Sequence, residues 1–194
     1  MSLAFLSPVG DVIARSPLER MAKAAGARFE VRDGWNVAVG YDRDSAGAPV
    51  VWADVSHLRK WEVRAGGELG TARREGEAWW CGLTQDRGLV LGGPAPDDAI
   101  DVTCNYAALR IQGPSSRETI ARFCALDLRP QNAPPHSFRP GSIARQPGMI
   151  LVEAEDRFLL LFGWAIAEYM WEVVADAARP LGGAPVGIEA ITDA

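Results

Sequence analysis

The feature that most constrains the fold is the alternation of apolar strand-like and helical segments after residue 99. Gly113-Pro114 separates the first strand from the first helix. The second helix follows directly on the strongly apolar segment Phe158-Leu159-Leu160-Leu161-Phe162. The predicted strands are residues 100–112, 143–145, 149–153, 157–162 and 186–191, and the predicted helices are residues 115–124 and 164–178. The order is roughly β-α-β-β-α-β, the order of a ferredoxin-like split unit.

The first half of the chain predicts a helix followed by a β-hairpin. Ser16-Pro17 is a helix start and Gly26 a helix stop, with Asp33-Gly34 as a tight turn further on. The predicted elements are a helix at 18–25 and strands at 28–32, 35–41, 50–53, 58–64, 78–83 and 89–91, with residues 1–15 loosely structured. A Gly- and Pro-rich linker ends this half. We therefore predict an α+β fold with an N-terminal region at 1–98 and a ferredoxin-like unit at 99–194, packed as one domain.

Composition argues against several classes of protein. The chain has 194 residues with 48% hydrophobic and 23% charged residues, which is typical of a globular protein. A formal net charge of -5 disfavours nucleic acid as a partner. The longest apolar stretch, residues 158–167, is about half the length that a membrane helix needs. We see no signal peptide at the N-terminus. Three scattered cysteines without a CxxC pair indicate reduced thiols and a cytoplasmic protein.

Motifs for cofactors, metals and nucleophiles are missing from the sequence. There is no GxGxxG, P-loop, HExxH or GxSxG pattern, so we predict no catalytic residue, no metal and no cofactor bound by this chain alone. Asp54-Val55-Ser56-His57 brings Asp, Ser and His close in sequence, but a triad depends on side-chain geometry. A turn is the more ordinary interpretation of this segment. We interpret Glu153, Glu155 and Asp156 as solvated turn carboxylates.

The last helix predicts a partner surface. Ile166, Met170, Val173 and Ala177 form one apolar stripe at helical spacing, which is the expected core face. Trp164 and Trp171 are seven residues apart and share a face nearly opposite that stripe. Exposed aromatic residues mark interaction sites, so we predict a partner interface at Trp164 and Trp171. The alternative is that the N-terminal segment or the Trp79-Trp80 hairpin covers these two side chains.

We also predict one core that joins the sheet to its two helices. Its members are Ile111, Ile120, Phe123, Leu159, Leu161, Met170 and Val173.

Several segments resemble the glycine-cleavage T-protein (aminomethyltransferase) superfamily. Residues 33–41 and 54–64 are similar to the opening of those proteins, with its Gly-Trp strand, Asp-Val-Ser-His segment and Glu-Val-Arg strand. Residues 107–114, with Ile111-Gln112-Gly113-Pro114, resemble the start of the second ferredoxin-like unit. Residues 156–161 and 167–171 resemble later segments. The length and order look closest to the gamma subunits of heterotetrameric sarcosine oxidase.

The resemblance implies a T-protein folate-binding-domain-like fold without its ligand site. In the superfamily, an Asn-x-x-Gly-Gly-Ile-x-Asp-Asp segment, a Gly-Tyr-Thr-Gly-Glu turn and an Arg-Asp-Thr-Leu-Arg helix handle folate. Residues 66–93, the turn at 153–157 and the end of the chain do not match them. The implied function is a noncatalytic gamma-type subunit. Its partners would be large flavoprotein subunits that hold FAD, FMN, NAD and tetrahydrofolate, in a complex that demethylates sarcosine.

The alternative reading is a stand-alone tetrahydrofolate-binding protein of the aminomethyltransferase type. It would use Asp54 or Asp33 as its carboxylate. The sequence leaves open whether the chain forms a homo-oligomer when it is isolated.

Overall fold

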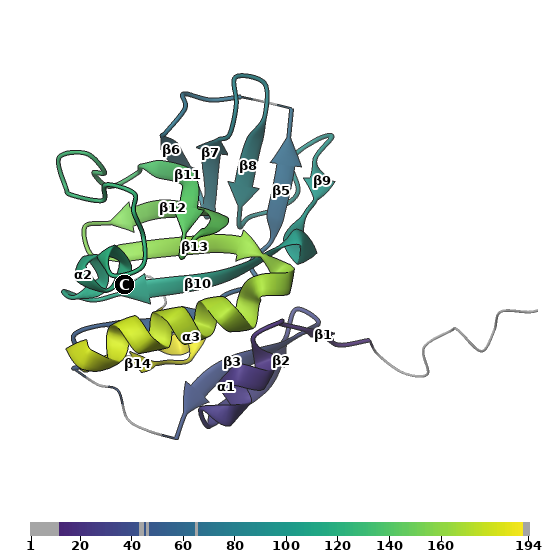
Figure 1. The fold of residues 1–194 in the computed structure, drawn as a ribbon. Helices are drawn as coiled ribbons and strands as arrows, with labels where there is room; N and C mark the ends of the chain where they lie inside the picture. The colour runs from purple at the N-terminus through teal and green to yellow at the C-terminus, as the bar shows by residue number, and fades with distance from the viewer. Residues whose placement is uncertain (1–11, 43–44, 46, 65, 192–194) are drawn as a thin grey trace, which may run out of the picture.

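A six-stranded sheet lies at the centre of the fold (Figure 1). The computed structural model describes residues 12–42, 45, 47–64 and 66–191. In spatial order the strands are β11 (Phe138–Ile143), β12 (Gln146–Ala154), β13 (Arg157–Gly163), β10 (Tyr106–Gln112), β4 (Val51–Asp54) and β14 (Ala184–Pro185). Neighbouring strands are antiparallel except β14, which runs parallel to β4. Strand β4 comes from the first half of the chain, so this sheet contains strands from both sides of residue 98.

Helices cover one face of the central sheet. They are α2 (Ser116–Ala121) and α3 (Ala167–Ala178), and the 3-10 turn η3 (Trp164–Ile166) leads into α3. Below α3 in Figure 1 lie helix α1 (Glu19–Ala24) and a small sheet of strands β1 (Ala14–Arg15), β3 (Trp35–Tyr41) and β2 (Ala27–Arg32). The Arg20 guanidinium donates a 2.6 Å hydrogen bond to Glu168, which ties α1 to α3.

A five-stranded antiparallel sheet packs on the other side. Its strands, in spatial order, are β6 (Ala72–Glu75), β7 (Ala78–Gly82), β8 (Gly88–Leu91), β5 (Lys60–Val63) and β9 (Ile100–Asp101). The turn η2 (Thr103–Asn105) connects β9 to β10 and divides the single strand expected at residues 100–112. This sheet stands above the central sheet in Figure 1.

The two faces of the central sheet bury separate cores. Side chains alternate along β13, so Phe158, Leu160 and Phe162 pack with the helices. Leu159 and Leu161 point the other way and pack against the five-stranded sheet. The prediction of a single core is therefore wrong for these two leucines. Ile111, Ile120 and Met170 are fully buried in the helix-side core, and Phe123 and Val173 are half-buried against it.

The fold class is confirmed, because the structure is a mixed α+β arrangement of the expected kind. The β2–β3 hairpin has the predicted turn, with Asp33 and Gly34 in the left-handed conformation at φ 49° and 76°. Such a turn matches the twist of the paired strands and favours Asp-Gly.

Two predicted strands are wrong. Ala144 and Arg145 form the turn between β11 and β12, with φ 49° and 63°. The strand expected at 186–191 is absent: the short β14 ends at Pro185, and the 3-10 turn η5 (Ile188–Ala190) follows it. Another 3-10 turn, η4 (Arg179–Leu181), follows α3. The expectation for residues 1–15 falls outside the described residues up to residue 11.

Candidate functional site

The segment from Asp54 to Lys60, which we call the Asp54–Lys60 loop, joins the central sheet to the five-stranded sheet. The Ser56 amide donates to Asp54 Oδ1 at 2.9 Å, which closes a local turn. Ser56 is fully buried, and its Oγ accepts a 3.1 Å hydrogen bond from the Ala108 amide of β10. The loop is therefore fastened to the central sheet by the Asp and Ser side chains that a catalytic interpretation would need.

Lys60 holds the loop from the inside. Its side chain is 0% exposed, and Nζ donates to the carbonyl oxygens of Ser56 and Leu58, each at 2.9 Å. The Lys60 amide donates to Thr103 Oγ1 at 3.1 Å. Burial lowers the pKa of Lys60 to about 8 although Asp54 and other acidic groups nearby raise it. The local sequence pattern does not indicate a buried cation here, because Lys60, Glu62 and Arg64 alternate with Trp61 and Val63 along this strand.

His57 lies in the same loop, and no hydrogen bond joins its ring to Ser56 in the described part of the chain. Burial is the first cause that lowers the pKa of His57 to about 4, and Lys60 and Arg110 lower it further. The imidazole is therefore neutral at pH 7. The Ser56 hydroxyl accepts from the Ala108 amide, and the Asp54 carboxylate accepts from the Ser56 amide, so both side chains serve a structural turn and not a triad.

A second buried polar group crosses the central sheet. Arg110 of β10 binds Glu153 of β12 in a bidentate pair, with Nε–Oε2 at 2.8 Å and Nη2–Oε1 at 2.7 Å. Arg157 Nε lies 3.7 Å from the same carboxylate. Glu153 is 5% exposed, so the interpretation of this residue as a solvated turn carboxylate is wrong. The Glu153 charge is therefore neutralised inside the protein. Its partner Arg110 lies 43 residues away in the sequence, and we did not predict this pair.

The tryptophans of the last helix have different surroundings. Trp171 is 4% exposed and packs edge-on against Trp52 of β4, with ring centroids 6.0 Å apart. Trp164 is half-buried and contacts Trp35 of β3 at 6.3 Å between centroids. The expected exposure is therefore wrong for Trp171. A partner interface through Trp164 and Trp171 stays a prediction that nothing in the structure tests.

The reason for this error is the orientation of α3. Its buried residues are Ala167, Met170, Trp171, Val174, Ala177 and Ala178. Val174 faces the core where Val173 was expected, so the buried stripe is rotated toward Trp171. Periodicity gives the spacing of a stripe but does not fix its exact direction when both flanks carry apolar residues.

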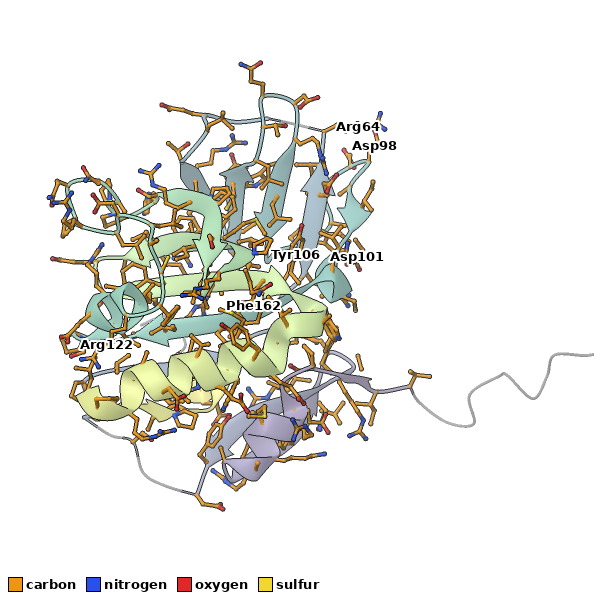
Figure 2. All side chains as sticks on the ribbon, in the orientation of Figure 1. Arg64, Asp98, Asp101, Tyr106, Arg122 and Phe162 are labelled. Carbon is orange, nitrogen blue, oxygen red and sulfur yellow. The ribbon has the colours of Figure 1, made fainter. Side chains whose placement is uncertain are left out.

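A hollow of about 660 Å³ lies over the outer face of the five-stranded sheet. Trp80, Arg64, Asp97 and Asp98 line it. Figure 2 shows Arg64 and Asp98 together at one corner of this sheet, with Asp101 nearer the central sheet. Both signs of charge meet there, so the hollow offers no uniform field for an anion or a cation.

The described ranges contain neither a cluster of metal-ligating side chains nor a membrane-spanning helix. No group of three or more His, Cys, Asp or Glu side chains there is arranged to hold a metal ion. No helix in the described part of the chain has the length and apolar character needed to cross a membrane.

Comparison with known proteins now identifies the fold. No model of a protein family matches the sequence. A chain of the heterotetrameric sarcosine oxidase from Corynebacterium sp. U-96, in complex with pyrrole 2-carboxylate, superposes with a TM-score of 0.69 and 17% identity over 88% of this chain and 97% of that chain. The glycine cleavage system aminomethyltransferase T from Bartonella henselae superposes with a TM-score of 0.71 and 15% identity, over 92% of this chain and 60% of that one.

The chain has the fold of aminomethyltransferase T. The sequence agrees with this fold: an aminomethyltransferase from Porphyromonas gingivalis is 29% identical over 115 residues. That match covers 57% of this chain and only 29% of the enzyme. The resemblance to the T-protein superfamily is thus supported by both sequence and structure.

Residues 66–93 are the region that does not match the first folate-handling segment of the T-protein superfamily. Residues 72–91 form strands β6, β7 and β8 of the five-stranded sheet. Their inward side chains, including Trp79, Cys81 and Leu89, are buried against the central sheet. This region is filled with apolar side chains, so it contributes packing where the resemblance would look for a carboxylate.

Proposed function

We propose that this chain is a noncatalytic, gamma-type subunit of a heterotetrameric complex resembling sarcosine oxidase. The observation that carries the proposal is the extent of the structural match. It spans 97% of one chain of a heterotetrameric sarcosine oxidase, whereas it spans 60% of an aminomethyltransferase T chain. A whole chain of a multisubunit enzyme therefore has this fold, while the aminomethyltransferase has further structure beyond it.

The buried polar groups support a noncatalytic role. Ser56 and Lys60 are fully buried and bind backbone groups, and Glu153 is bound by Arg110. Groups that are committed to the fold in this way are not free to donate or accept a proton during a reaction.

The remaining parts of the proposal follow from the resemblance. The partners would be large flavoprotein subunits of an amine oxidase complex that hold FAD, FMN, NAD and tetrahydrofolate, in the cytoplasm. The complex would oxidise sarcosine and transfer its methyl carbon to tetrahydrofolate. This chain would contribute a folded surface and no cofactor of its own.

The test is affinity isolation of the tagged chain from its source cells, followed by mass spectrometry. We expect a large flavoprotein to be recovered in a stoichiometric amount. Recovery of the chain alone, under conditions in which a known complex of the same cells stays intact, would contradict the proposal.

A stand-alone tetrahydrofolate-binding protein is the second candidate, since the curated relative is an aminomethyltransferase. It requires a carboxylate that can reach the ligand. Asp54 is buried and accepts from the Ser56 amide, and Asp33 lies in the exposed hairpin turn. Calorimetric titration of the isolated chain with tetrahydrofolate separates the two candidates. Saturable binding lost in the Asp54→Asn variant would favour the second one, and no heat of binding is expected under the first.

A further inference from the structure

Two hollows follow one another along α3, between this helix and the turn that joins β11 to β12. The first, of about 390 Å³, is lined by the start of β12 and by η3. The second, of about 520 Å³, is lined by the turn, by the end of α2 and by α3. Tyr169 of α3 donates its hydroxyl to the Ala144 carbonyl of the turn at 3.1 Å, which joins the two walls. We call this surface, with both of its hollows, the α3–turn crevice.

Three apolar side chains of the helix border the crevice. Ile166 lines the first hollow, and Tyr169 and Val173 line the second. Their spacing of three and four residues places them along one edge of the helix. Tyr169 is 46% exposed, and Ile166 and Val173 are half-buried. The rotation of α3 toward Trp171 therefore leaves at the surface two residues, Ile166 and Val173, that the periodicity of the helix assigns to the core.

Gly163 keeps the first hollow open. It pairs with Tyr106 of β10, so a side chain at position 163 would lie on the same face of the sheet as Tyr106, which also lines this hollow. A Cβ there would meet no heavy atom within 4 Å apart from its chain neighbours, and the backbone, at φ -56° and ψ 140°, suits any residue. Neither the backbone nor the packing of the described residues requires glycine here. The missing side chain leaves room for an apolar group of another molecule.

The charged side chains that line the crevice are all positive. They are Arg122 and Arg145, and no Asp or Glu of the described residues lines either hollow. Arg122 donates to Glu118 at 2.9 Å. The Arg145 side chain has no hydrogen bond or ion pair within the described part of the chain. In a chain with a net charge of -5, this crevice thus presents an uncompensated positive charge beside apolar walls.

The backbone of the turn does not account for Arg145. Ala144 and Arg145 have φ 49° and 63°, a left-handed conformation that Gly and Asn adopt more readily. An arginine in such a turn is therefore better explained by what its side chain binds than by the turn itself.

We propose that the α3–turn crevice binds a segment of the large partner subunit that carries an apolar side chain for the first hollow and a carboxylate for Arg145. This inference rests on the proposed subunit role, because that role supplies the partner chain. The apolar walls call for an apolar partner surface, and the unpaired arginine calls for a negative charge on it. Tyr and Arg are also residue types that carry much of the binding energy of protein interfaces.

The test measures how tightly purified full-length variants bind the flavoprotein that the tagged wild-type chain isolates from its source cells, after the two are separated at high salt. Arg145→Glu is expected to weaken binding about tenfold, because it sets like charges against each other. Arg64→Glu is the matched control, since Arg64 is also exposed but lines the hollow over the five-stranded sheet. Wild-type affinity in Arg145→Glu, or an equal loss in Arg64→Glu, would overturn the proposal.

A second pair of variants tests the first hollow without a change of charge. Gly163→Leu places a side chain in the space meant for the partner and is expected to weaken binding about tenfold. Gly163→Ala fills little of that space and should stay within about threefold of the wild type. Urea unfolding of both variants should match the wild type, because the fold leaves room for the new side chain.

Two outcomes separate this inference from the subunit role. Wild-type affinity in Gly163→Leu would overturn the crevice as the docking surface, while the subunit role would stand because the wild-type chain binds the flavoprotein. Failure of the wild-type chain to isolate any flavoprotein would contradict the subunit role, and the inference would fall with it.

Discussion

The two faces of the central sheet bury different kinds of polar group. On the face toward the five-stranded sheet, Lys60 donates to two carbonyls and Glu153 is bound by Arg110. On the helix face, the Tyr41 hydroxyl and Trp52 Nε1 have no hydrogen-bond partner among the described residues. On the first face the charged groups are paired within the fold, while the neutral Gln112 Oε1, two residues along β10 from Arg110, has no partner among the described residues. For these residues the contrast is therefore between buried charges, which are paired, and buried neutral groups, which are not.

The largest expected effect comes from breaking the Arg110–Glu153 pair. Arg110→Met leaves a carboxylate that is 2% exposed at its side chain with only the more distant Arg157 beside it. We expect the free energy of unfolding, measured with urea, to fall by about 3–5 kcal/mol.

Arg87→Met is the matched control, because Arg87 binds Glu62 at 2.7 Å in an exposed pair. Its expected cost is about 0–1 kcal/mol. Equal costs for the two variants would mean that the buried pair has no special place in the fold.

The next effect is the removal of the buried ammonium group. Lys60→Met takes the donor away from the Ser56 and Leu58 carbonyls, so we expect a loss of about 2 kcal/mol in the free energy of unfolding. Lys23→Met changes the other lysine of the chain, whose side chain is 52% exposed, and is expected to cost under about 1 kcal/mol. A loss in Lys60→Met no larger than in Lys23→Met would contradict this role.

The stability of the wild type and of Lys60→Met should also depend differently on pH. The pKa of Lys60 is about 8 in the folded chain and 10.5 ordinarily. Between these values the unfolded chain binds more protons, so stability rises with pH. As the pH is raised from 8 to 10.5, the urea midpoint of the wild type should therefore rise relative to that of Lys60→Met. A constant difference over that range would show that the ammonium group is not desolvated.

A smaller effect is expected from His57 in acid. Its pKa is about 4 in the folded chain, against 6.5 ordinarily. The unfolded chain binds more protons between these values, so stability falls as the pH is lowered from 6.5 toward 4. We expect the wild type to lose about 1–2 kcal/mol more than His57→Gln between pH 7 and pH 5. His136→Gln, which changes the chain's other and exposed histidine, should behave like the wild type.

The smallest effect tests the helix face. Tyr41→Phe removes a hydroxyl without a partner in the described chain, so the free energy of unfolding should change by less than about 0.5 kcal/mol or rise slightly. Tyr169→Phe removes a satisfied hydroxyl and should cost about 1 kcal/mol. A larger loss in Tyr41→Phe would mean that its hydroxyl is already satisfied within the fold.

The sequence predicted the elements whose signals are local. The Asp33-Gly34 turn, helix α3 and the apolar strand β13 depend on neighbouring residues, and all three were found. It did not predict which face of β13 each leucine occupies. The side chains on both faces are apolar, so no alternation of polar and apolar residues distinguishes the faces.

The buried polar groups were missed for a different reason. Glu153 and Arg110 are 43 residues apart in the sequence. They come together because β12 and β10 both pair with β13, one on each side of it. Trp171 is buried because β4, which comes from the first half of the chain, places Trp52 against it. Contacts of this kind depend on the topology, which no local pattern encodes.

The most direct test of the proposed subunit role is sedimentation velocity on the tagged chain isolated from its source cells. The boundary is followed at a wavelength where only flavin absorbs and again at one where protein absorbs. We expect the chain to sediment with the flavin absorbance, as a species several times heavier than its own 20.9 kDa. Sedimentation of the chain as a colourless species of about its own mass would contradict the account.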